Sequence, residues 1–165
     1  MIHAIDPGLA NTAIVTWCGR IVAARTFSTK GDGHKTDPVR ALERCREITA
    51  KVMECVTPGD TIVMESYIDI PGGTYRIAAN RWTTPILIGY LCCALDASGC
   101  TIILQRPDVV LKIYAAHKQA WGNKLTGLLP GDNVLLHNGD GRKRGNDHER
   151  SAAAHLAYYL GRYPK

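Results

Sequence analysis

At 165 residues the chain is long enough for one domain with a single continuous core, and its 45% hydrophobic content excludes a disordered protein. No segment is apolar for long enough to cross a bilayer, and the first residues do not resemble a signal peptide, so we expect a cytoplasmic protein without a membrane partner. The net charge is +5, and basic residues outnumber acids after Gly99, which permits but does not establish a phosphate-binding partner.

The N-terminal part of the chain reads as three strands. Residues 1–6, 12–18 and 21–27 are rich in β-branched and apolar side chains, and short turns separate them. Six cysteines are spread through the chain without a Cys-x-x-Cys pair, so we expect buried free thiols instead of a zinc site or disulfides. The first third of the chain therefore predicts an antiparallel meander.

Helices and strands alternate through the rest of the chain. Asp37 and Pro38 predict a helix start, with an apolar face running to Val56, and 61–64 reads as a short strand that ends at Glu65. Residues 74–97 read as a helix that is kinked or broken at Pro85. Residues 101–104 read as a strand, Pro107 opens a short helix, and 115–146 has no clear pattern. A last helix is expected from about 147 to 160.

This order predicts an α/β fold with a mixed five-stranded sheet, in which three antiparallel strands are followed by two parallel ones. Helices should cover both faces of such a sheet. We find no internal repeat and no domain boundary, so 1–165 is expected to form a single domain.

Acidic residues occur where separate elements of this fold should meet. Asp6 ends the first strand before a Pro-Gly turn, Glu65 ends the fourth strand, and Asp147, His148 and Glu149 open the last helix. If the first and fourth strands lie side by side and parallel, their carboxylates share one edge of the sheet. Converging carboxylates suit Mg²⁺ or Mn²⁺, and two such ions can activate water and stabilise the leaving oxygen of a phosphodiester.

Each acid also has a purely structural interpretation. Asp6 could cap its own turn, Glu65 could be a solvated strand end, and Asp147 or Glu149 could complement the dipole of the last helix. The coincidence of three sites favours the metal interpretation. His3 and His155 are instead expected to be ordinary core or surface histidines.

The segment Ile5-Asp6-Pro7-Gly8-Leu9-Ala10-Asn11-Thr12 resembles the opening motif of the RuvC-type Holliday junction resolvases. Val63-Met64-Glu65 is similar to the second acidic strand of that family, and residues 148–157 resemble its closing helix. The resemblance implies an RNase H-like fold, a homodimer, two metal ions in each active site, and symmetrical nicking of a four-way DNA junction without a small-molecule cofactor. It makes Asp6 and Glu65 the first two catalytic acids.

The third motif departs from the family pattern. The family usually has two acids three residues apart here, with histidine first in some members, whereas this chain has His148 and Ser151. Serine cannot supply the charge of a carboxylate, so Asp147 is the best substitute, with His148 as a ligand or proton-transfer group. Ser151 and Glu149 rank lower as ligands.

Contacts with DNA are predicted at three places. Tyr67 and Ile68 precede the Gly72-Gly73 loop, where family members have an apolar wedge, and an exposed aromatic there could stack on a base or could equally pack under the long helix. Arg76 and Arg81 would then face phosphates. The remaining basic candidates are Lys112, Lys118 and the loop cluster Arg142, Lys143 and Arg144, for which a solvated loop is the alternative.

Three other functions compete with junction resolution. A nuclease of the same fold could act on other branched DNA or on RNA, and Ser151 keeps open a non-catalytic junction-binding protein. The Asp-Pro-Gly segment also resembles the phosphate loop of sugar kinases and actin-like ATPases. Those proteins need two lobes around a nucleotide, and 165 residues provide one.

Overall fold

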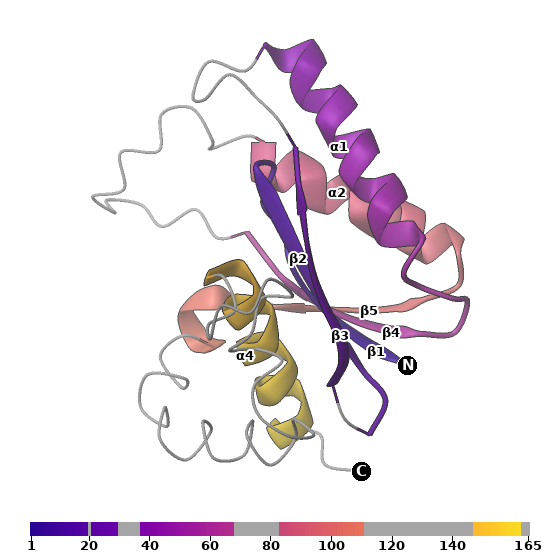
Figure 1. Ribbon diagram of the computed structural model, residues 1–165, viewed down its shortest axis with the longest axis vertical. Helices are drawn as coiled ribbons and strands as arrows, with labels where there is room; N and C mark the ends of the chain where they lie inside the picture. The colour runs from indigo at the N-terminus through magenta and orange to yellow at the C-terminus, as the bar shows by residue number, and fades with distance from the viewer. Residues whose placement is uncertain (20, 30–36, 68–82, 111–146, 163–165) are drawn as a thin grey trace.

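The computed structural model describes residues 1–19, 21–29, 37–67, 83–110 and 147–162. Within these ranges five strands form one sheet in the order β3-β2-β1-β4-β5 (Figure 1). The strands are β1 (Ile2–Asp6), β2 (Asn11–Trp17), β3 (Ile21–Ser28), β4 (Thr61–Glu65) and β5 (Thr101–Gln105).

The pairing of the strands confirms the predicted mixed sheet. β1 pairs antiparallel with β2, and β2 pairs antiparallel with β3, so the N-terminal meander is confirmed. β4 lies parallel to β1 on one side and to β5 on the other. β1 is therefore central, and its carboxyl end lies beside the carboxyl end of β4.

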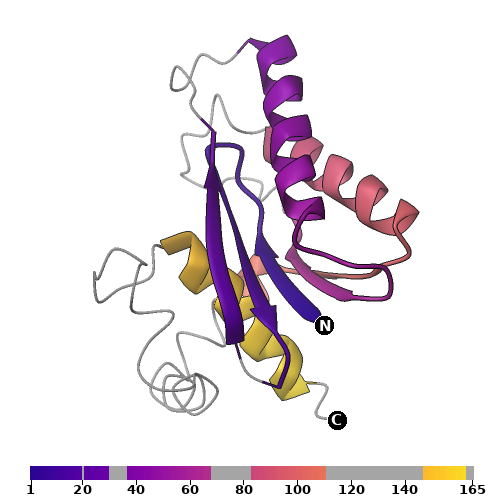
Figure 2. The same ribbon diagram turned by 45° about the vertical axis from the view of Figure 1, so that its right-hand side comes forward.

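Helices cover both faces of the sheet, as predicted (Figure 2). α1 (Pro38–Met53) and α2 (Thr83–Ala97) pack on one face, where Ile5, Ile14 and Met64 meet the apolar side chains of both helices. α4 (Asp147–Arg162) packs on the other face, where Ala4, Val15 and Val63 contact its small and apolar side chains, namely Ala152, Ala153 and Leu156. Alternate residues of each strand point to opposite faces, so β1 contributes to both cores.

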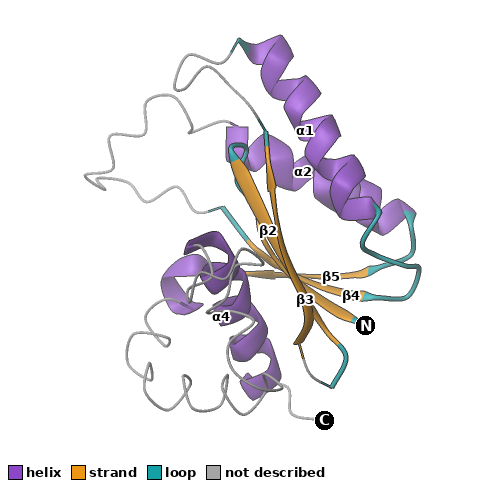
Figure 3. Cartoon of the chain, viewed as in Figure 1, coloured by secondary structure: helices purple, strands orange, loops and turns teal. Residues whose placement is uncertain are grey.

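The start of α1 follows the predicted signals (Figure 3). Asp37 caps α1, its side chain accepting a hydrogen bond from the Val39 amide at 3.4 Å, and Pro38 is the first helical residue. Pro85 is the third residue of α2, which the structure describes from Thr83. Residues 107–110 are helical. The predicted helical residues 74–82 lie outside the described residues, and so does the unassigned stretch 115–146.

At the amino ends of the parallel strands, Asp60 forms a buried polar cluster. Its carboxylate accepts hydrogen bonds from the N-terminal amine of Met1, from the Thr57 amide and hydroxyl, both at 2.8 Å, and lies 3.1 Å from His3 Nε2. His3 Nδ1 is also 3.0 Å from the Thr16 hydroxyl. His3 is thus a satisfied core histidine, as expected from the sequence.

The cysteines are all unpaired, as predicted, but not all are buried. Cys45 and Cys100 lie in the core, whereas Cys18 and Cys93 are exposed, because Cys18 follows the end of β2 and Cys93 lies on the outer side of α2. Among the helices that the structure describes, none has the length and apolarity to span a membrane.

Candidate active site

The turn after β1 holds Asp6 at the end of the strand through a short set of contacts. The Thr12 hydroxyl donates to the Gly8 carbonyl at 2.9 Å and accepts from the Gly8 amide at 3.3 Å, which closes the turn. A Cβ atom on Gly8 would lie 2.5 Å from the Asn11 carbonyl oxygen, so only glycine fits. The Asp-Pro-Gly segment and Thr12 therefore fix the backbone conformation of the turn that follows Asp6.

α1 anchors the same turn from the other side. The Arg44 guanidinium donates to the Thr29 hydroxyl at 2.7 Å and to the Leu9 carbonyl at 3.2 Å. Thr29 in turn donates its hydroxyl hydrogen to the Leu9 carbonyl at 2.6 Å, and its amide donates to the Ala10 carbonyl. These contacts satisfy backbone groups of a turn that must stay close to the sheet edge.

Asp6 and Glu65 are brought together by the parallel pairing of β1 and β4. Ile5 is opposite Met64, so the next position along each strand carries one of the two acids. Burial raises the pKa of Asp6, and repulsion from Glu65 raises it further, to about 6, against the lowering effect of the His148 contact. The parallel register therefore places these two acids side by side at one edge of the sheet.

α4 covers the two acids with its first turns. His148 Nδ1 lies 2.8 Å from Asp6 Oδ2, and the Ser151 hydroxyl is 3.5 Å from Glu65 Oε2. His148 and Ser151 are one helical turn apart and share the face toward the sheet edge. The backbone of Asp147 begins α4, but its side chain lies outside the described residues, so its predicted role remains a prediction.

Glu149 points away from the two acids, toward β3. It is 8% exposed, and its Oε1 accepts a hydrogen bond from the Thr26 hydroxyl at 2.9 Å. This contact agrees with its low rank as a candidate ligand. Glu149 instead ties the start of α4 to the meander.

His155 and its partner Gln105 lie at this site, and sequence reasoning missed the contacts of both. His155 is fully buried, with Nε2 3.4 Å from Glu65 Oε2 and Nδ1 2.9 Å from the Gln105 side-chain oxygen. Its core location was expected, but its contact with a candidate catalytic acid was not. The available signal was its spacing, because His155 falls one turn after Ser151 on the same helix face.

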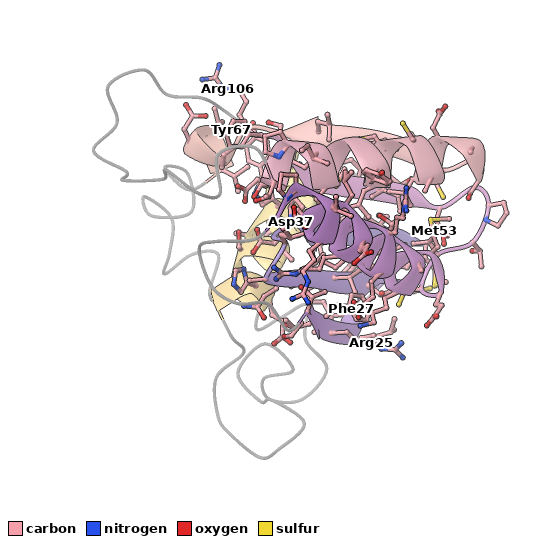
Figure 4. All side chains as sticks on the ribbon, turned by 90° about the horizontal axis from the view of Figure 1, so that it is seen from above. Arg25, Phe27, Asp37, Met53, Tyr67 and Arg106 are labelled. Atoms are coloured by element: carbon pink, nitrogen blue, oxygen red, sulfur yellow. The ribbon has the colours of Figure 1, made fainter. Side chains whose placement is uncertain are left out.

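Of the predicted DNA contacts, only Tyr67 lies within the described residues. Tyr67 is exposed and lies just after the end of β4. Its neighbour Ser66 joins the ends of β4 and β5, because the Ser66 amide donates to the Gln105 carbonyl at 2.8 Å. Figure 4 shows Tyr67 and Arg106 at the same end of the sheet. The other candidates lie outside the described residues: Ile68, Arg76, Arg81, Lys112, Lys118, Arg142, Lys143 and Arg144.

The donor set at this edge fits a hard divalent cation better than a soft one. It offers two carboxylates, a serine hydroxyl and a histidine nitrogen, and the mutual repulsion of Asp6 and Glu65 is what a cation would relieve. Within the described ranges no three His, Cys, Asp or Glu side chains already stand in a metal-binding arrangement.

No protein-family model and no curated protein matches the chain in sequence. Among solved structures, Thermus thermophilus RuvC is similar with a TM-score of 0.63 and 18% identity, over 98% of this chain and 95% of that one. The T. thermophilus RuvC complex with a Holliday junction substrate matches with a TM-score of 0.62 and 17% identity, covering 98% and 94%. The Fowlpox virus resolvase with Holliday junction DNA has a TM-score of 0.50 and 13% identity, covering 98% and 99%.

Proposed function

We propose that this chain, which has the RNase H-like fold of the RuvC-type resolvases, is a metal-dependent endonuclease that cuts Holliday junctions. The observation that carries the proposal is the convergence of Asp6, Glu65 and His148 at the carboxyl ends of two parallel strands. We further propose that the whole chain acts as one domain and works as a homodimer, since symmetrical resolution requires a cut in each of two strands.

Asp6 and Glu65 are the proposed metal ligands, with His148, Asp147 and Ser151 completing the set. Mg²⁺ or Mn²⁺ bound there, as two ions, would activate a water molecule and stabilise the leaving oxygen of the phosphodiester. The contact of His148 Nδ1 with Asp6 orients that carboxylate. The other ring nitrogen of His148, Nε2, can then bind a metal ion or transfer a proton. Burial of Asp6 excludes water from one side of the site.

The substrate side of the proposal rests on Tyr67 and on basic residues of the predicted loops. Tyr67 is 37% exposed and lies two residues after the proposed Glu65 ligand, so it could stack on a base near the cut. Both junction complexes among the similar structures contain Holliday junction DNA. A four-way junction is therefore the first substrate to test.

A nicking assay with Mg²⁺ or Mn²⁺ tests this function on a four-way junction, a fork, a flap, a linear duplex and an RNA–DNA hybrid. We expect paired symmetrical nicks in the junction, with Asp6→Asn inactive. Asp96→Asn is a matched control, because Asp96 is an exposed acid at the end of α2, remote from the Asp6 edge. Cutting that survives Asp6→Asn would overturn the metal site, and binding of the junction without cutting would favour a non-catalytic protein.

A further inference from the structure

His155 connects the interior of the protein to the candidate site. Its imidazole is fully buried and lies between two side chains from different strands. One ring nitrogen, Nδ1, is 2.9 Å from Gln105 Oε1, and the other, Nε2, is 3.4 Å from Glu65 Oε2. The three residues come from α4, β5 and β4, so their contact depends on the completed fold.

The sheet fixes the distance that the imidazole bridges. Glu65 and Gln105 are direct partners in the parallel pairing of β4 and β5. Just beyond them, the Ser66 amide and hydroxyl both donate to the Gln105 carbonyl, at 2.8 and 3.0 Å. The backbone therefore holds Gln105 in place, and Gln105 is itself buried at 6% exposed.

The hydrogen positions follow from the groups that surround the ring. If Nδ1 donates to Gln105 Oε1 in a neutral ring, Nε2 presents a bare lone pair to a carboxylate oxygen, which is repulsive. As the side chains stand, Gln105 Nε2 and His155 Nε2 are buried and make no hydrogen bond within the described residues, so the 3.4 Å approach of His155 Nε2 to Glu65 is an ion-pair distance. Rotating the Gln105 amide lets its NH₂ donate to Nδ1, and the ring hydrogen then sits on Nε2.

A doubly protonated ring also places a hydrogen on Nε2. The neutral ring with a rotated Gln105 amide and the doubly protonated ring therefore both place an N–H of His155 toward Glu65. Only the neutral ring protonated on Nδ1 would place a lone pair there, and that arrangement is unfavourable. The Ser151 hydroxyl approaches the same Glu65 oxygen at 3.5 Å, one helical turn earlier. Glu65 Oε2 is thus approached by two side chains of α4, the fully buried His155 and the half-buried Ser151.

We propose that His155, oriented by Gln105, is a positioning residue that fixes the Glu65 carboxylate for metal binding. The inference rests on the proposed function, in which Glu65 is a metal ligand. Carboxylate ligands are commonly oriented by hydrogen-bond donors behind them, and loss of such a donor costs about 10- to 100-fold in metal affinity. The His155 contact would also orient Glu65 in a chain that has serine instead of an acid at position 151.

Mn²⁺ titration calorimetry of the full chain, with the folded fraction checked by circular dichroism, tests the proposal. We expect His155→Ala to weaken Mn²⁺ binding about 10- to 100-fold. His3→Ala is the matched control, because His3 is an equally buried histidine beside a carboxylate at the opposite end of the sheet. It should lose stability while keeping wild-type Mn²⁺ affinity, and a His155→Ala variant that also keeps wild-type affinity would overturn the proposal.

Gln105→Leu provides a second variant that leaves the histidine in place. Because Gln105 acts through His155, we expect it to weaken Mn²⁺ binding, and the double variant to bind no more weakly than His155→Ala alone. Additive losses in the double variant would contradict a shared route to Glu65.

Nitrogen NMR of the histidine rings gives a readout that needs no metal. We expect a hydrogen on His155 Nε2, with a resonance that moves in Glu65→Gln, and a bare Nε2 would overturn the proposal. Wild-type protein that binds no Mn²⁺ and cuts no junction would instead overturn the proposed function. The two failures are therefore distinguishable.

Discussion

His148 Nδ1 lies 2.8 Å from Asp6 Oδ2, although the two residues are 142 positions apart in the chain. The contact joins the start of the last helix to the end of the first strand. Burial of Asp6 and the nearby Glu65 raise the pKa of the Asp6 carboxyl to about 6, against the lowering effect of His148. A charged Asp6 at neutral pH therefore reduces the stability of the metal-free protein, which is common at functional sites.

Asp6→Asn should stabilise the metal-free protein while abolishing cleavage. The folded-state pKa of about 6 exceeds the reference value of 3.8, so an ionised Asp6 lowers stability at pH 7, and an amide removes that effect. The expected gain is about 1–3 kcal/mol, or a rise in Tm of several degrees by calorimetry in EDTA. A lower Tm than Asp96→Asn would contradict it.

Metal affinity should fall in acid because protons and cations compete for Asp6. Below pH 6, near the raised pKa of this carboxyl, Mn²⁺ affinity should decrease by about tenfold per pH unit, and above pH 7 it should change little. Calorimetric titrations between pH 5 and 8 measure this dependence. Equal affinities at pH 5 and pH 7 would exclude Asp6 as a ligand that must lose its proton.

Ser151→Asp should restore a carboxylate at the position where the resembling family has one. The Ser151 hydroxyl is 3.5 Å from Glu65 Oε2, so the new charge would face an existing acid. We expect a lower Tm without metal and about tenfold tighter Mg²⁺ binding, equivalent to about 1.4 kcal/mol. Ser151→Ala is the control, and equal effects of both substitutions would place residue 151 outside the metal site.

Asp60→Asn should destabilise the fold without disturbing the candidate site. Burial alone would raise the pKa of Asp60, but hydrogen bonds from the N-terminal amine, Thr57 and His3 outweigh burial and hold it well below its usual range. The ionised form therefore stabilises the fold above pH 4, and that contribution is lost as the pH falls further.

The expected loss for Asp60→Asn is about 3 kcal/mol in urea unfolding at pH 7, because several buried donors lose a charged acceptor. Mn²⁺ affinity of the folded variant should equal that of the wild type, since the cluster lies at the opposite end of the sheet from Asp6. Weakened metal binding would show that the two ends are coupled.

Tyr67→Ala should weaken binding to branched DNA and leave folding unchanged. The side chain is exposed and follows Glu65, so its loss removes a stacking surface and little core. We expect a loss of about 1–3 kcal/mol in affinity for a four-way junction, measured by fluorescence anisotropy at fixed salt. Tyr67→Phe, which keeps the ring, should bind like the wild type.

The sheet was predictable because its information is local. Apolar runs of strand length, polar turns and an acid as the last residue of β1 and of β4 are each visible within a few residues, and the topology follows from their order. The meeting of Asp6 and Glu65 follows from that topology and needs no side-chain detail. The segment from Ile5 to Thr12 could be recognised as a motif because its structure is also local. Only glycine fits the turn at position 8, and the Thr12 hydroxyl bonds to the Gly8 carbonyl.

The roles of His155 and Gln105 were not predictable for a physical reason. A histidine within an alanine run indicates burial, but its partner depends on the rotation of α4 against the sheet. Gln105 ends β5, and only the register of β4 against β5 brings it beside Glu65. Neither the rotation of α4 nor the register of β4 against β5 can be predicted from a short segment of the sequence.

The docking of α4 also determines when the candidate site can first form in a newly made chain. Its helix supplies His148, Ser151 and His155, and it covers the face formed by Ala4, Val15 and Val63. On a translating ribosome the strands emerge long before this helix does. In a nascent chain the acids of β1 and β4 would thus stay uncovered until α4 has been made and has packed against the sheet.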